Sequence, residues 1–146
     1  TPIWYGWLLG GGPFDLRPLI LGLTASLWTL PHLWSLAYVY AGDYRRVGVP
    51  MLPAVEGEGE AVKAILLSLT ALIISSLTLI PFSKTSIYPA SALTLSIILS
   101  YLGLRLRHEP SGRRAWRLFK ATSPYIILLL AAYALDQAWE TLLVCG

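Results

Sequence analysis

Long stretches without a charged side chain are the feature that most constrains this sequence. No Asp, Glu, Lys or Arg occurs in residues 18–42, 64–83, 85–104 or 121–135, which are 25, 20, 20 and 15 positions long. The hydrocarbon core of a membrane is about 30 Å thick, and a helix needs roughly 20 apolar residues to cross it. Because 55% of the residues are hydrophobic and only 13% are charged, a soluble globular domain and a disordered chain are excluded. The single Cys145 excludes an internal disulfide. The sequence therefore predicts an all-α membrane bundle of several spans.

Glycine, proline and charge clusters divide the sequence into one partial and four full membrane helices. We expect the partial helix over residues 1–12 and the full spans over 18–40, 62–81, 87–104 and 123–144. A Gly- and Pro-containing polar loop over 41–61 and a basic loop over 105–120 join the spans, and 83–86 form a tight connection. Because the first helix is short and the sequence does not begin with Met, we expect 1–146 to be the C-terminal part of a longer, single-domain protein.

The basic residues predict the orientation of these spans. With alternating helices, the loops 41–61 and 105–120 lie on one side of the membrane, together with the start of the second full span. That side holds nine of the eleven basic residues, namely Arg45, Arg46, Lys63, Arg105, Arg107, Arg113, Arg114, Arg117 and Lys120. Cytoplasmic loops are enriched in Lys and Arg, so both long loops are expected in the cytoplasm of a multi-pass cell-membrane protein. The C-terminus then faces the outside.

The end of the first full span carries the polar groups that could do chemistry. Pro31 lies deep in this apolar helix, where a proline favours a kink, and His32 follows it. His32, Leu36 and Tyr40 are spaced four residues apart and share one helical face, which Asp43 extends to the membrane surface. Ionisable residues inside membrane spans are rare and usually face the interior of the bundle. We interpret this face as the wall of a cavity that opens to the cytoplasm, although His32 could instead be a core histidine bonded to a neighbouring helix.

A carboxylate, a phenol and two guanidinium groups follow at the mouth of the expected cavity. Carboxylates are ligands for Mg²⁺, which usually keeps several waters and bridges phosphates, and Arg suits bidentate contact with phosphate. An apolar cavity closed by Asp43, Arg45 and Arg46 would therefore suit a lipid diphosphate. Two simpler interpretations stay open: the arginines could be plain cytoplasmic anchors, and Asp43 could be a turn or helix-end residue.

The same segment resembles a known family. Residues 28–37 (WTLPHLWSLA), Asp43-Tyr44 and residues 47–57 (VGVPMLPAVEG) keep the order and spacing of motifs found in the protoheme IX farnesyltransferases, or heme O synthases. These are members of the superfamily of membrane prenyltransferases typified by UbiA. The sequence departs from the family pattern at Leu30, Tyr40 and Gly42, and Tyr40 stands where the family commonly has an arginine.

The resemblance implies half of a nine-helix fold and a specific reaction. Family members transfer a farnesyl group from farnesyl diphosphate to a vinyl group of heme B, and Mg²⁺ held by two acidic motifs binds the diphosphate. On this basis Asp43 is the expected metal ligand and catalytic residue. His32 is expected on the heme side, and the remaining substrate contacts are Tyr40, Tyr44, Arg45, Arg46 and Lys63. The N-terminal half of the same enzyme and the lipid bilayer are the other expected partners.

Several alternatives remain open from the sequence. A related enzyme could use another acceptor, such as a quinone precursor or a lipid, and a non-catalytic membrane bundle is a different class of function. Glu56, Glu58 and Glu60 precede a helix expected to start near Val62, where they favour its positive end or form a second metal site. Asp136 is expected near the outer face, pointing to water or into the bundle.

Overall fold

The computed structural model describes residues 2–50 and 57–145, and within these ranges the regular structure is entirely helical. The helices are α1 (Pro2–Leu9), α2 (Leu16–Val39), α3 (Ala41–Arg46), α5 (Glu58–Leu77), the 3₁₀ turn η1 (Ile80–Phe82), α6 (Ile87–His108) and α7 (Gly112–Val144). Four of them, α2, α5 (followed by η1), α6 and α7, are long and apolar enough to cross a membrane. The predicted all-α membrane bundle with four full spans is confirmed.

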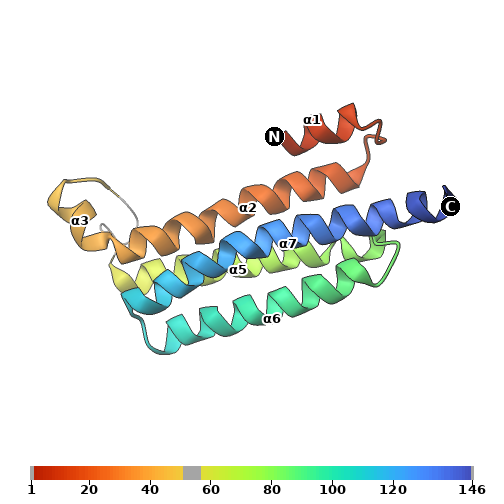
Figure 1. The fold of residues 1–146 in the computed structure, drawn as a ribbon. Coiled ribbons are helices and arrows are strands. Elements are labelled where there is room, and N and C mark those ends of the chain that lie inside the picture. Colours follow the sequence, from red (N-terminus) through yellow and green to blue (C-terminus); the bar gives the residue numbers. More distant parts are fainter. Residues whose placement is uncertain (1, 51–56, 146) are drawn as a thin grey trace.

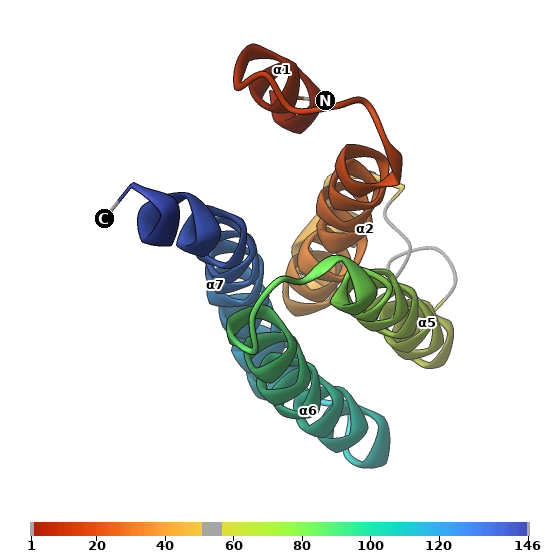
Figure 2. The same ribbon diagram turned by 90° about the vertical axis from the view of Figure 1, so that its right-hand side faces the viewer.

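The four long helices form a ring in which each packs against two neighbours. α2 contacts α5 and α7, while α6 closes the ring by contacting both α5 and α7. Figures 1 and 2 show this arrangement, with α1 lying beside α2. The ends of α2 and α6, the starts of α5 and α7, and α3 gather at one end, which we call the basic end (Figure 1, left). All nine basic residues predicted to share a side are carried there.

The predicted basic loop over 105–120 is wrong, because most of it is helix. α6 continues to His108 and α7 begins at Gly112, so only 109–111 connect them. The Ser111 hydroxyl caps α7 by accepting a hydrogen bond from the Arg114 amide at 3.3 Å. Arg105, Arg107 and His108 lie in the last turn of α6, where positive charge is favourable. Charge clusters here mark where the helices leave the membrane, not where they end.

The other helix bounds differ less from the prediction. α2 starts two residues early because the Asp15 carboxylate accepts from the Arg17 amide at 2.9 Å and caps the helix. α2 then runs through Pro31 without ending. α5 begins at Glu58, four residues before the predicted start, so Glu58 and Glu60 lie inside its first turn. Glu56 lies outside the described residues.

Hydrogen bonds donated by side-chain hydroxyls hold the ring together inside the predicted membrane. The Thr24 and Ser75 hydroxyls are 2.7 Å apart and join α2 to α5. On α6, the Tyr88 hydroxyl donates to the Ser76 carbonyl at 2.6 Å, and on α7 the Tyr125 hydroxyl donates to the Ser76 hydroxyl at 2.9 Å. Polar groups in a membrane need internal partners, so these bonds fix the relative positions of the four helices.

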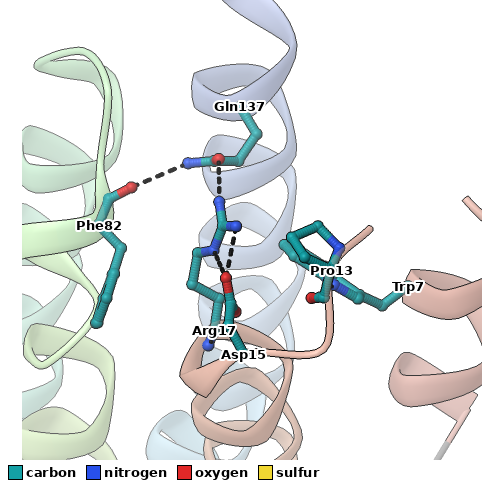
Figure 3. Close-up of polar contacts among 6 residues, drawn as sticks. All are labelled: Trp7, Pro13, Asp15, Arg17, Phe82 and Gln137. Carbon is teal, nitrogen blue, oxygen red and sulfur yellow. Dashed lines mark hydrogen bonds and ion pairs between the residues drawn. The ribbon is translucent and has the colours of Figure 1, made fainter. Parts of the chain in front are cut away.

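At the opposite end, which we call the distal end, Arg17 links the start of α2 to α7. Its guanidinium contacts the Asp15 carboxylate at 2.6 Å and donates to the Gln137 side chain at 3.5 Å. The Gln137 amide in turn donates to the Phe82 carbonyl at 3.2 Å (Figure 3). The Trp7 indole donates to the Pro13 carbonyl at 2.8 Å, which holds the α1–α2 turn next to this group (Figure 3).

The structure shows which way the side chain of Asp136 points, which the sequence left open between water and the bundle. Its side chain is fully buried and points into the bundle. The carboxylate accepts hydrogen bonds from the backbone amides of Lys84 at 2.6 Å and Thr85 at 2.9 Å, and from the Thr85 hydroxyl. Asp136 therefore fixes the tight connection between η1 and α6.

Candidate functional site

The site begins where α2 ends and the short helix α3 follows. Tyr40 ends α2, and α3 starts at the next residue. After α3, Gly48 has a φ of +73°, its amide donates to the Arg45 carbonyl at 3.4 Å, and the Val49 amide donates to the Tyr44 carbonyl at 3.0 Å. This pair of bonds is the Schellman motif, which requires a left-handed residue and so favours glycine. The Gly48-Val49-Pro50 part of the recognised motif thus ends α3, while 51–56 lie outside the described residues.

α3 brings four of the predicted site residues together. Asp43 lies in its first turn, Arg45 and Arg46 lie in its last turn, and all three are exposed. Tyr44 is half-buried, and Tyr40, which immediately precedes α3, is 42% exposed. The arrangement presents one carboxylate and two guanidinium groups to the surroundings of the basic end.

Lys63 lies apart from α3 on the first turns of α5. Its ammonium group contacts the Glu60 carboxylate at 2.6 Å, and its side chain is 74% exposed. Glu60 is therefore engaged by a cation, which does not favour the second metal site considered for these glutamates. Lys63 also lines a hollow between α5 and α6 that contains Arg107.

The donor set at α3 fits one kind of magnesium site. Among the described residues, no three His, Cys, Asp or Glu side chains gather closely enough to hold a metal. Asp43 can thus supply one carboxylate ligand, but not a closed protein cage. Mg²⁺ commonly binds through one or two carboxylates while it keeps waters and bridges phosphates, and Asp43 fits that role.

His32 lies against α7, so at this level the expected cavity wall is a contact between helices. Its Nδ1 is 2.7 Å from the Thr122 hydroxyl, which itself donates to the Phe119 carbonyl at 2.7 Å. When the hydroxyl donates to the Phe119 carbonyl, Nδ1 must carry the imidazole proton and donate to Thr122. A neutral His32 therefore has its lone pair on Nε2. The geometry matches the interpretation of His32 as a histidine bonded to a neighbouring helix, and this pair of bonds favours one tautomer.

An aromatic stack surrounds His32 that the sequence did not predict. The His32 ring lies between Trp28 on α2, at 4.8 Å between centroids, and Phe119 on α7, at 4.4 Å. Trp116 continues the stack at 5.2 Å from Phe119, and the Lys120 ammonium lies 5.4 Å from the Trp116 ring. The Trp28 indole donates to the Thr122 carbonyl at 2.8 Å and holds the two helices in register. The sequence signal was the helical spacing of Trp28 with His32 and of Trp116 with Phe119.

The two parts of the site differ in chemistry and lie in series along one helix. From His32 to Tyr40, α2 rises by about 12 Å. At the outer end, exposed charges can bind a hydrated anion. Farther in, aromatic faces and an imidazole with a favoured tautomer can contact an apolar or cationic group.

Comparisons with known proteins identify relatives of this chain. A protoheme IX farnesyltransferase of Metallosphaera sedula is 38% identical over 134 residues, which are 92% of this chain and 47% of the relative. One of Pyrobaculum neutrophilum is 41% identical over 135 residues, covering 87% of this chain and 46% of the relative. Protoheme IX farnesyltransferase 1 of Cenarchaeum symbiosum is 35% identical over 137 residues, covering 94% and 46%.

The chain spans just under half the length of these curated relatives. No solved structure matches it. The resemblance seen in residues 28–57 is confirmed, since the model of the UbiA prenyltransferase family matches residues 1–131. With 131 matched positions and a helical membrane bundle, this chain belongs to the UbiA prenyltransferase family.

Proposed function

We propose that this chain is the C-terminal part of a heme O synthase-like enzyme, which transfers a farnesyl group from farnesyl diphosphate to a vinyl group of heme B. The observation that carries the proposal is the order of groups along α2 and α3. An aromatic, histidine-containing stack between α2 and α7 is followed by an exposed carboxylate and two arginines at the end of α2. The names of the relatives, protoheme IX farnesyltransferase, support the choice of substrates.

The diphosphate is proposed to bind at α3. Arg45 and Arg46 supply guanidinium groups for its oxygens, and Asp43 holds Mg²⁺ on the same short helix. Tyr40 and Tyr44 are the further candidate contacts at α3. Lys63 is also expected from the sequence to contact the diphosphate, but it lies on α5 in an ion pair with Glu60 and is not part of this proposal. Bound Mg²⁺ would supply charge stabilisation for the departing diphosphate.

The acceptor is proposed to bind deeper, near His32. When the bond to diphosphate breaks, the allylic carbon of the prenyl chain becomes cation-like, and the faces of aromatic rings stabilise such a charge. The stack of Trp28, Phe119 and Trp116 supplies these faces, and His32 Nε2 can accept a proton or contact the heme. A site inside an apolar bundle also keeps water away from the cation.

The basic end is proposed to face the cytoplasm. All nine of the basic residues counted above belong to helix ends and connections at this end of the bundle, whereas Arg17 and Lys84 lie at the other. The positive-inside rule then places α3 and the diphosphate site in the cytoplasm. A single cysteine at Ser111, in a variant with Cys145 replaced by Ser, should resist a membrane-impermeant reagent added to intact cells. Labelling of residue 111 from outside would reverse this orientation.

The test of the function is farnesyl transfer by the chain with and without a partner half. Residues 1–146 are expressed alone, or together with the N-terminal half of a heme O synthase, in a host lacking its own enzyme. Heme B, farnesyl diphosphate and Mg²⁺ are supplied, and heme O is measured by mass. We expect heme O only when both halves are present. Heme O from the 146-residue chain alone would show that the second half is dispensable.

Asp43 is tested in the complete enzyme. Asp43→Asn keeps the shape of the side chain but removes its charge, and should cost about 2.7–4 kcal/mol of transition-state stabilisation, or about 10²–10³ in rate. Asp15→Asn is the matched control, because it makes the same change at the opposite end of α2. Normal turnover by Asp43→Asn at equal protein levels would remove Asp43 from the mechanism.

A further inference from the structure

A groove runs along the seam between α5 and α6 and has positive charge at one end. The part of the groove at the basic end is a hollow of about 510 Å³. The residues that line it include Lys63, Leu66, Thr70 and Arg107. A second hollow of about 190 Å³ continues it toward the middle of the bundle and shares Leu66 and Thr70 with the first. The two hollows therefore form one continuous depression, which we call the α5–α6 groove.

A glycine opens the deeper part of this groove. Gly103 on α6 is buried, and a Cβ atom placed there would lie 3.1 Å from Leu69 Cδ1 and 3.2 Å from Leu66 Cδ2. The deeper walls are mainly leucine and isoleucine, with the hydroxyl groups of Thr70 and Ser100 among them. The lining residues Leu67 and Leu104 are 74% and 50% exposed. Exposed leucines on a spanning helix suit contact with hydrocarbon, so the acyl chain of a lipid could enter the groove from this face.

The length of the groove matches one leaflet of a membrane. The part of the groove that lies beyond its basic mouth runs from Lys63 to Ile73, which are ten residues apart on α5, or about 15 Å along the helix. The hydrocarbon core is about 30 Å thick, so this part of the groove spans about half of it. An acyl chain from one leaflet could follow the groove while its headgroup stays at the basic end.

Charge at the mouth selects the headgroup. Lys63 and Arg107 bring two positive charges, of which Glu60 offsets one through its contact with Lys63 at 2.6 Å. An arginine side chain forms paired hydrogen bonds with phosphate, and basic pockets between membrane helices bind anionic headgroups. We propose that the α5–α6 groove binds an anionic phospholipid, with its phosphate at Arg107 and Lys63 and an acyl chain along Leu66, Thr70 and Gly103.

The test measures lipid binding to the purified protein in detergent, by native mass spectrometry, with phosphatidylglycerol and phosphatidylcholine added separately. We expect phosphatidylglycerol to bind preferentially. Arg107→Gln should weaken that binding about fivefold, which is the effect of one cation near the headgroup. Glu60→Gln should strengthen it, because it removes the competing carboxylate. Arg113→Gln is the matched control at another exposed arginine of the basic end and should change nothing.

Thr70→Phe distinguishes a lipid from free phosphate. Thr70 is exposed on α5 and lines both hollows. The ring of a phenylalanine at this position therefore fills the groove without entering the core. It should reduce phosphatidylglycerol binding while leaving both cations in place. Equal binding of the two lipids would overturn the proposal. The proposal would also be overturned if Thr70→Phe left phosphatidylglycerol binding unchanged, or if inorganic phosphate displaced the bound phosphatidylglycerol. Circular dichroism of each variant confirms that it has folded.

Discussion

Removing the carboxylate of Asp136 should destabilise the bundle more than any other single change near the distal end. Asp136→Ala leaves the Lys84 amide, the Thr85 amide and the Thr85 hydroxyl without their acceptor. Each hydrogen bond to a charged group contributes about 1.5–3 kcal/mol, but the connection lies at the end of the bundle, where water can replace part of the loss. We expect the free energy of unfolding to fall by about 3–5 kcal/mol, because three donors lose a charged acceptor and water restores part of the loss.

Three further variants separate the carboxylate from its surroundings. Asp136→Asn keeps one oxygen acceptor but turns an N–H group toward donors, so it should cost about half as much as alanine. Gln137→Ala, the comparison variant on the next residue, loses three longer contacts, at 3.2 Å to Phe82, 3.4 Å to Asp136 and 3.5 Å to Arg17, and should cost less than about 1 kcal/mol. In a double-mutant cycle, Thr85→Val and Asp136→Ala should show a coupling of about 1–2 kcal/mol.

Unfolding of the protein in mixed micelles, followed by far-ultraviolet circular dichroism at neutral pH, measures these differences. The reasoning depends on the carboxylate being the acceptor that water cannot fully replace. An Asp136→Ala variant within about 1 kcal/mol of the wild type would refute it, because the three donors would then be satisfied by water.

The remaining predictions concern the two ends of α2 and the helix after it. Thr122→Val removes the acceptor of the His32 Nδ1 proton, so the ¹⁵N spectrum of His32 should change from one tautomer to a mixture; an unchanged spectrum would contradict the assignment. Gly48→Ala places a side chain at a φ of +73° and should cost about 1–2 kcal/mol locally, seen as faster hydrogen exchange of the Val49 amide without a change in global unfolding. Hydrogen bonds from the adjacent arginine lower the pKa of Asp15 below its ordinary value. The stabilisation of the fold by the Asp15 carboxylate is therefore fully present above the unfolded pKa, near 4, and is lost as the pH falls through the lower pKa of the folded state. The thermal unfolding temperatures of the wild type and Asp15→Asn should therefore converge in acid.

The membrane spans could be predicted because charge is costly in hydrocarbon, and the charge-free stretches mark where the chain must be apolar. The same signal could not give the helix bounds, since a helix continues beyond the membrane without changing its hydrogen bonds. Residues 105–120 show the consequence: their charges indicate the membrane surface, but α6 and α7 extend through most of them. Ser111 was the available local signal, because a serine with a β-region backbone caps the following helix.

The site could be predicted only where it is local in sequence. Asp43, Tyr44, Arg45 and Arg46 lie on one short helix, so their proximity follows from the chain itself. The contact of His32 with Thr122 joins positions 90 residues apart, and it depends on how α2 and α7 are rotated about their axes. Asp136 presents the same difficulty, since composition alone does not tell whether a carboxylate near a helix end faces water or the bundle.

The contacts of His32 bear on how the two parts of the proposed site are positioned. Trp28 and His32 are both bound to Thr122, through the carbonyl and the hydroxyl of that one residue. α7 therefore sets the rotation of α2 at this level, whereas the exposed residues of α3 are placed by the end of α2 and by the turn at Gly48. The inner part of the site is thus fixed by packing between two spans, and the outer part depends on one short helix with no buried residue. Because α3 has so few contacts to lose, it can adjust to a bound anion without disturbing His32, so binding at the charged end need not carry a cost at the aromatic end.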